Sequence, residues 1–272
     1  MSITDLFTAF FYGIVEGITE WLPISSTGHL IILEDLIPLP LGNRFKVLFD
    51  VVIQFFAVLA VVTVYAKKLE PFTKSEKLFL AHDKIRLWAK IIIAVIPSAV
   101  VGLFLDEIIE EYLFNSTCVA CCLIIYGCVF MFIERRSKMQ CTDISTGTAL
   151  KIGFFQALAL VPGTSRSGAT IVGGLLCGLT RESAAEFSFF MSLPTMLGAS
   201  CLKLIKYFLV GYNVSTSEII FLLAGGASAY FVSLLVIRYL IDFLKKHSFR
   251  VFGIYRILLG VIILIYVNFE RI

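Results

Sequence analysis

Long apolar segments dominate the pattern of hydrophobic and polar positions along this chain. A helix that crosses a bilayer needs about 20 predominantly apolar residues. Six segments meet that requirement, with only a few charges near their ends: 47–66, 87–105, 117–133, 186–206, 218–241 and 251–269. The pattern therefore predicts six membrane-spanning helices.

Two further apolar stretches, 6–33 and 152–180, carry a polar break in the middle. The first break reads Leu22-Pro23-Ile24-Ser25-Ser26-Thr27-Gly28-His29, and the second reads Val161-Pro162-Gly163-Thr164-Ser165-Arg166-Ser167-Gly168. Irregular backbone at membrane depth is tolerated only where protein buries it or where it lines a cavity. We therefore predict a re-entrant pair of half-helices in each stretch.

The order of these segments repeats along the chain. Residues 1–140 contain one broken hairpin followed by three spans, and residues 141–272 contain the same series. Because three is an odd number of crossings, the second copy must enter the membrane from the opposite side. The sequence thus predicts one all-α polytopic membrane domain with six transmembrane helices and two re-entrant hairpins. The two copies form an inverted-topology repeat, and such repeats place a binding site near the midplane, where the breaks meet.

Composition agrees with a membrane protein. Hydrophobic residues make up 58% of the 272 positions and charged residues only 16%, against about 25% charged in an average soluble domain. The net charge of +3 is too small to indicate binding to a polyanion. These values exclude a soluble globular enzyme, a disordered chain and a nucleic-acid binder.

The distribution of basic residues predicts the orientation, because cytoplasmic connections are enriched in Lys and Arg. Thirteen such residues lie in the connections 67–86, 134–151 and 242–250, and two lie in 34–46, 106–116 and 207–217. The first set is therefore expected in the cytoplasm. Both termini and the opening of the first hairpin are then expected on the outer, periplasmic side.

Four ionisable side chains lie inside the broken hairpins, where a charge is costly: Glu16, Glu20, His29 and Arg166. Glu16 and Glu20 are one helical turn apart and share a face, where they repel each other unless a cation lies between them. Arg166 is one candidate counter-ion, and a divalent metal held by both glutamates is the other. The alternative is a purely structural role, in which these side chains form a buried ion pair that joins the two repeats.

The first break places hydroxyl groups beside an imidazole. A serine hydroxyl becomes a nucleophile when a neighbouring base takes its proton, and histidine is the usual base near neutral pH. We therefore predict that Ser26 and His29 act together as nucleophile and base, and that Glu20 or Glu16 orients the imidazole. Ser25 and Thr27 are expected either to cap the following half-helix or to bind an anion there.

The second break has the composition of an anion-binding cradle. Glycine lets the backbone approach a ligand closely, and the free N–H groups at a helix start attract phosphate. The side chains of Thr164, Ser165 and Ser167 would supply hydroxyls, and the fork of Arg166 would bind phosphate oxygens in pairs. Two further polar residues, Gln54 and Glu186, are expected to support the site, although Glu186 is equally explained as a charge at a helix start.

These motifs resemble those of a known family. Residues 13–30, which contain Glu16, Glu20 and Ser25-Ser26-Thr27-Gly28-His29, are similar to the first signature of the undecaprenyl-diphosphate phosphatase family of the BacA type. Residues 162–170 resemble its second signature, and 50–54 and 186–189 resemble flanking segments, with Asp50 where relatives would carry Glu.

The resemblance implies an enzyme of the bacterial plasma membrane that removes the terminal phosphate from undecaprenyl diphosphate. Its product is the lipid carrier of peptidoglycan synthesis, and its members are associated with bacitracin resistance. It also implies a divalent cation, Mg²⁺ or Ca²⁺, bound near Glu16 and Glu20. Ser26 becomes the nucleophile, with His29 as the alternative nucleophile, and Thr27, Ser165, Arg166 and Ser167 become phosphate binders.

The rival hypothesis is a transporter or flippase of polyprenyl-phosphate lipids, because inverted repeats with broken helices are common in transporters. A transporter needs only binding groups, whereas a phosphatase also needs a nucleophile beside a base. The hydroxyl of Ser26 and the imidazole of His29 favour the phosphatase. In both cases the partners are a polyprenyl phosphate or diphosphate lipid and the bilayer, with no nucleic acid, and the sequence leaves a homodimer open.

Overall fold

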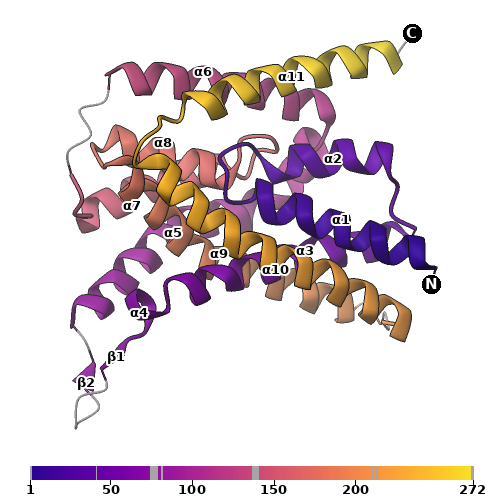
Figure 1. Ribbon diagram of the computed structural model, residues 1–272, viewed down its shortest axis with the longest axis horizontal. Coiled ribbons are helices and arrows are strands. Elements are labelled where there is room, and N and C mark those ends of the chain that lie inside the picture. Colours follow the sequence, from indigo (N-terminus) through magenta and orange to yellow (C-terminus); the bar gives the residue numbers. More distant parts are fainter. Residues whose placement is uncertain are drawn as a thin grey trace.

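The structure is a computed structural model that describes residues 2–40, 42–73, 79–80, 82–136, 141–209, 211 and 214–270. Within these residues the chain forms eleven helices and one short hairpin (Figure 1). In chain order the elements are α1 (Ile3–Thr19), α2 (Ser26–Leu36), α3 (Asn43–Val64), α4 (Ala66–Leu69), β1 (Phe72–Thr73), β2 (Phe79–Leu80), α5 (His82–Leu113), α6 (Ser116–Arg136), α7 (Thr146–Leu158), α8 (Arg166–Leu176), α9 (Arg181–Leu209), α10 (Thr216–Leu244) and α11 (Arg250–Glu270).

Six of these helices are long and apolar enough to cross a membrane. The spans are Phe45–Val64, His82–Leu105, Ser116–Glu134, Arg181–Leu209, Thr216–Leu244 and Arg250–Phe269, with mean hydropathies between 1.4 and 2.5. They coincide with the six predicted spans, so the prediction of an all-α multi-pass membrane protein is confirmed. The antiparallel pairing of β1 with β2, two residues each, lies inside the predicted connection 67–86 and does not alter the fold class.

One helix continues beyond its predicted span, which itself ends at Leu105 as predicted. The acidic run that begins at Asp106 was expected in a connection, but α5 continues through it to Leu113. The run contains only residues that are compatible with a helix, chiefly Ile and Glu, and neither Gly nor Pro follows Gly102 before the helix ends. The helix therefore extends beyond its apolar span.

Two pairs of short helices take the place of the predicted broken hairpins. Helix α1 is followed by α2 after a break at 20–25, and α7 is followed by α8 after a break at 159–165. Helices α2 and α8 have 11 residues each, which corresponds to about 16 Å of length at 1.5 Å per residue. Neither is long enough to cross a hydrocarbon layer of about 30 Å. Their re-entrant placement in a membrane stays a prediction.

The two breaks end in the same local geometry. Ser25 and Ser165 precede α2 and α8 with φ of 75° and 70°, and they are the two described residues other than glycine with positive φ. Each serine hydroxyl accepts a hydrogen bond from the backbone N–H three residues later, that of Gly28 or Gly168. The expected capping role of Ser25 is therefore present, whereas no cap bond involves Thr27 among the described residues.

The packing of the helices brings both breaks to the middle of the molecule (Figure 1). Helix α1 packs along α10, α7 packs along α5, and α3 packs against α9 and α10. The pair α6 and α11 lies side by side, and α6 also contacts both α2 and α8. Helix α2 thus packs against α1 and α6, and α8 packs against α6, α7 and α9.

Two glycines allow the close approach of α1 and α7 to their neighbours. A Cβ atom on Gly13 would collide with Ser228 and the carbonyl of Gly225 on α10, and a Cβ atom on Gly153 would collide with the backbone of Ala94 on α5. Contacts of this kind between small residues are typical of helices packed in a membrane.

Candidate active site

A buried cluster joins the two breaks. Glu20 directly follows α1, Ser26 is the first residue of α2, and Arg166 is the first residue of α8. The Ser26 hydroxyl donates to Glu20 Oε2 at 2.8 Å, and Arg166 Nη2 donates to Glu20 Oε1 at 2.6 Å. The carboxylate of Glu20 therefore bridges a hydroxyl group and a guanidinium group that come from different halves of the chain.

Arg166 is held from several sides. Its Nη1 atom donates to the backbone oxygen of Ser188 on α9 at 2.9 Å, and its guanidinium carbon lies 5.8 Å from the centre of the Trp21 ring. The Nε–H group is buried and has no hydrogen-bond partner among the described residues. The fork is thus fixed in direction while one donor stays available for a ligand.

Hydrogen bonds of side-chain hydroxyl groups join the second break to the first. Ser167 donates to the backbone oxygen of Glu20 at 3.1 Å, and its hydroxyl lies 3.1 Å from that of Ser165. One turn further along α8, the Thr170 hydroxyl is 2.7 Å from the Ser188 hydroxyl. The predicted phosphate binders Ser165 and Ser167 are therefore brought to the cluster.

Glu16 is the exceptional residue of the site. It lies one turn before Glu20, is completely buried, and neither carboxylate oxygen has a hydrogen-bond partner among the described residues. One oxygen of Asp50, on α3, is buried and unpartnered in the same way. The charged groups that act on Glu16 are Glu20, Asp50 and Arg166. Buried polar groups are nearly always hydrogen-bonded, so these oxygens indicate a missing partner.

The unpartnered oxygens allow a test of the implied divalent cation. No group of three His, Cys, Asp or Glu side chains within the described part of the chain could enclose a metal ion. Mg²⁺, however, is usually held by one or two carboxylates together with water and substrate phosphates. Glu16 offers two unused oxygens, whereas both oxygens of Glu20 are hydrogen-bonded. The residues thus fit a cation whose coordination is completed by a phosphate ligand.

No hydrogen bond among the described residues joins His29 to Ser26. Its Nδ1 atom is 2.7 Å from the backbone oxygen of Ser25, and its Nε2 atom is 2.7 Å from the Tyr255 hydroxyl on α11. A carbonyl can only accept, so Nδ1 carries the proton and Nε2 accepts from Tyr255. The hydrogen-bond acceptor for Ser26 is therefore Glu20 rather than the expected imidazole. A catalytic role for His29 stays a prediction.

Four other predicted residues lie outside this network. Both carboxylate oxygens of Glu186 accept from Lys68 Nζ at 2.8 Å, so its side chain forms a separate ion pair. No hydrogen bond between the described residues joins the side chains of Gln54, Thr27 or Thr164 to the cluster, although Thr164 is buried beside it in the second break. Their expected roles stay predictions.

Three contact residues were not singled out from the sequence. Ser188 and Trp21 lie in segments that the resemblance covers, but nothing in their residue type indicated contact with Arg166. Arg256, by contrast, interrupts the apolar run of α11, and a charge inside a membrane segment is a signal of function or partnership. It is completely buried.

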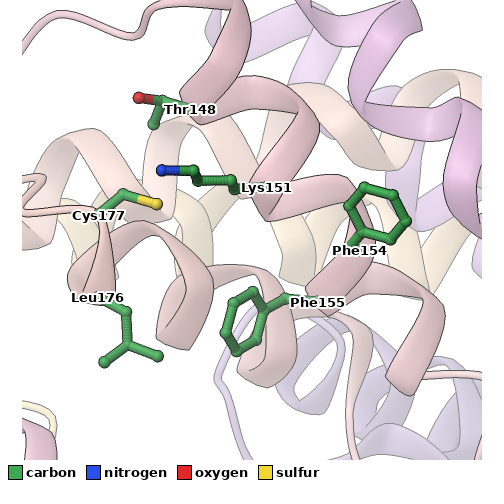
Figure 2. A pocket seen from close by; sticks show the side chains of 6 residues that line it. All are labelled: Thr148, Lys151, Phe154, Phe155, Leu176 and Cys177. Carbon is green, nitrogen blue, oxygen red and sulfur yellow. The ribbon is translucent and has the colours of Figure 1, made fainter.

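Two hollows lined by described residues lie apart from this cluster. Figure 2 shows one of about 360 Å³ between α7 and the end of α8, lined by Thr148, Lys151, Phe154, Phe155, Leu176 and Cys177. A second, of about 440 Å³, includes Lys68 and Glu186. Neither hollow is lined by Glu20, Ser26 or Arg166.

Comparison with known proteins identifies the family. Residues 9–262 match the family model described as Bacitracin resistance protein BacA. The chain belongs to the BacA family. Its relatives include Undecaprenyl-diphosphatase 1 of Clostridioides difficile (strain 630), 48% identical over 97% of both chains, and Undecaprenyl-diphosphatase of Enterococcus faecalis, 46% identical over 97% of this chain and 98% of the relative. Undecaprenyl-diphosphatase of Streptococcus suis (strain 05ZYH33) is 47% identical over 97% of both chains. The BacA match covers both breaks.

Proposed function

We propose that this protein hydrolyses undecaprenyl diphosphate to undecaprenyl phosphate and inorganic phosphate in a bacterial plasma membrane. The observation that carries this proposal is the Ser26–Glu20–Arg166 cluster, which joins the two breaks of a BacA-family chain. A hydroxyl, a carboxylate and a guanidinium in contact are the groups that phosphoryl transfer requires. By renewing the carrier lipid and removing the diphosphate form, the reaction supports peptidoglycan synthesis and bacitracin resistance.

Substrate phosphate would lie at the starts of α2 and α8. A helix start presents free N–H groups and the positive end of the helix dipole, and two such starts face one cluster here. The Nε–H group of Arg166 and the hydroxyls of Ser165 and Ser167 would supply further hydrogen-bond donors at the start of α8. Oriented donors of this kind stabilise the charge that develops on the phosphoryl oxygens.

Ser26 is the nucleophile of the proposed reaction and Glu20 its base. When a phosphate oxygen draws Arg166 away from Oε1, the carboxylate of Glu20 is free to take the Ser26 proton through Oε2. The Ser26 oxygen then bonds to the terminal phosphorus, the bond from that phosphorus to the bridging oxygen breaks, and Glu20 passes the proton to the departing lipid phosphate. In the second step Glu20 takes a proton from the attacking water and returns it to Ser26 as inorganic phosphate leaves.

The implied cation, Mg²⁺ or Ca²⁺, would be held by Glu16, with Glu20 as its neighbour. It would supply charge neutralisation at the diphosphate. The unpartnered oxygens of Glu16 support this assignment, since a buried carboxylate without any partner is costly.

We also propose that residues 1–140 and 141–272 are inverted repeats whose hairpins are re-entrant. Support comes from the equivalent positions and matching geometry of Ser25 and Ser165, and from the paired packing of α1 on α10 and α7 on α5. The excess of basic residues in 67–86, 134–151 and 242–250 supports an outer position for the first hairpin. A homodimer stays a prediction, which a mass measurement in detergent would test.

Purified protein in detergent, assayed for phosphate release from a C55 polyprenyl diphosphate with and without EDTA, tests the proposed function. Ser26→Ala should abolish turnover without changing elution or melting temperature. Ser200→Ala is the matched control, because Ser200 is also a buried serine, but its hydroxyl donates to the backbone oxygen of Val51 on α3 and to no carboxylate among the described residues. Substantial phosphate release by the Ser26 variant would reject Ser26 as the nucleophile, and absence of release by the native protein would reject the function.

A further inference from the structure

A buried arginine lies behind the two breaks. Arg256 is on α11, and its side chain is completely buried. Its Nη2 atom donates to the backbone oxygens of Gly163 at 2.8 Å and Thr164 at 3.0 Å, and its Nη1 atom donates to that of Pro23 at 3.0 Å. A longer bond of 3.5 Å runs from Nε to the oxygen of Leu123 on α6. One guanidinium thus binds the carbonyls of both breaks at once.

The partners of Arg256 are unusual because none is a carboxylate. The ion pairs found among the described residues do not include it, and the only ring near its guanidinium carbon is that of Tyr126, at 5.6 Å. A buried charge without a counter-ion is costly. The positive charge is therefore balanced only by backbone dipoles, which leaves a net positive charge beside the break residues.

Arg256 also lies against the first turn of α8. A Cβ atom on Gly168 would lie 3.2 Å from Arg256 Nη1, and Gly168 follows Ser167 in this turn. The Pro23, Gly163 and Thr164 carbonyls accept from Arg256, whereas the carbonyl of Glu20 in the first break accepts from Ser167.

We propose that Arg256 is a positioning residue that holds the two breaks in a fixed position relative to each other for phosphoryl transfer. It does not touch the substrate; it acts through the carbonyls that it binds, and its charge strengthens the attraction of the two helix starts for phosphate. This inference rests on the proposed function, because it assigns a task to Arg256 in that reaction. A guanidinium is required for the task, since a lysine ammonium cannot reach the carbonyls of both breaks from a single point.

Kinetics of Arg256→Lys test the positioning role. A displacement of about 1 Å in a reacting group can lower the rate by about 100-fold, so kcat should fall 10- to 100-fold. KM should change less than about threefold, because Arg256 makes no contact with the lipid. Arg250→Lys is the matched control, since Arg250 is exposed at the start of the same helix, and its kinetics should equal those of the native protein.

A spectroscopic measurement reports on the breaks without using activity. The chain has two tryptophans, and in a Trp88→Phe background the remaining Trp21 is buried in the first break beside Arg166. If Arg256 holds the breaks, Arg256→Lys should increase acrylamide quenching of Trp21 at least twofold. Should the native protein prove inactive, the proposed function fails, while this measurement still decides whether Arg256 holds the breaks.

Two outcomes would overturn the inference: native kcat in the lysine variant, or reduced kcat with unchanged Trp21 quenching. If the lysine variant does not give a single folded species, Gly168→Ala provides a second test. Its added methyl group would lie 3.2 Å from both Arg256 Nη1 and the Cβ atom of Ser165 while the charge and the carbonyls are retained, so a fall in kcat and a rise in quenching are expected if Arg256 holds the breaks. Native kinetics and quenching in that variant would also reject the proposal.

Discussion

Replacement of Arg166 by lysine separates the two tasks that its guanidinium performs. One task is to balance Glu20, through the 2.6 Å bond from Nη2. The other is to clamp the transferring phosphoryl group, through the unpartnered Nε–H and the fork that Ser188 fixes in direction. Lysine retains the charge but has a single nitrogen, so it can serve Glu20 or the phosphate but lacks the paired geometry.

The structure sets the expected magnitudes. Both side chains of the Arg166–Glu20 pair are largely buried, with 13% and 8% of their surface exposed. Removal of one partner from a buried pair costs about 3–5 kcal/mol, so Arg166→Ala should lose stability as well as turnover. Loss of one oriented donor to a developing oxyanion costs about 10²–10³ in rate, or roughly 2.7–4 kcal/mol. Arg166→Lys should therefore stay folded and show that loss in kcat.

The assay is kcat/KM on a C55 polyprenyl diphosphate beside the melting temperature in the same detergent. Arg181→Lys is the control, because Arg181 also pairs with a buried carboxylate, that of Glu134, through bonds of 3.0 and 2.7 Å. It should lower the melting temperature and leave kcat unchanged. Near-native turnover in Arg166→Lys would refute the clamp and leave Arg166 as a structural ion pair.

Two further predictions concern the cation and the membrane topology. Glu16→Gln should raise the melting temperature, because an unpaired buried carboxylate becomes a neutral amide, while turnover falls and the remaining activity loses its response to EDTA. An unchanged EDTA response would remove Glu16 from the cation site. In a background without native cysteines, Asn115→Cys should react with an impermeant thiol reagent on intact cells and Asp143→Cys should not, since the two exposed positions lie in connections predicted on opposite sides. The reverse labelling pattern would overturn the predicted orientation.

The sequence predicted the spans well because each is a continuous apolar run of about 20 residues, a signal that does not depend on tertiary contacts. The breaks were equally clear, since proline, glycine and serine interrupt apolar stretches. Helix α5 continues beyond the predicted span 87–105 because its last turns are acidic but still favour a helix, as at Glu107 and Glu111. Polarity alone does not decide where a helix ends.

The side-chain partners inside the site were harder to predict. Proximity in sequence favoured Ser26 with His29, but His29 hydrogen-bonds to Tyr255, 226 residues away, and Ser26 to Glu20. The His29 contact depends on where α11 lies relative to α2, which no local pattern encodes. Arg256 did carry a signal, as an arginine within an apolar run, but its partners are backbone oxygens, which have no signature in a sequence.

The charges of the site explain why a cation and the substrate should depend on each other. Glu16 lies one turn before Glu20, Asp50 is a third carboxyl group whose charge acts on Glu16, and a diphosphate adds more negative charge. Arg166 and Arg256 offset part of this charge, but Arg256 reaches the site only through the backbone. A phosphate that approaches the free oxygens of Glu16 would be repelled unless a cation lies between them. Because coupling between two ligands is reciprocal, a cation that lowers this repulsion must itself bind more tightly when the diphosphate is present.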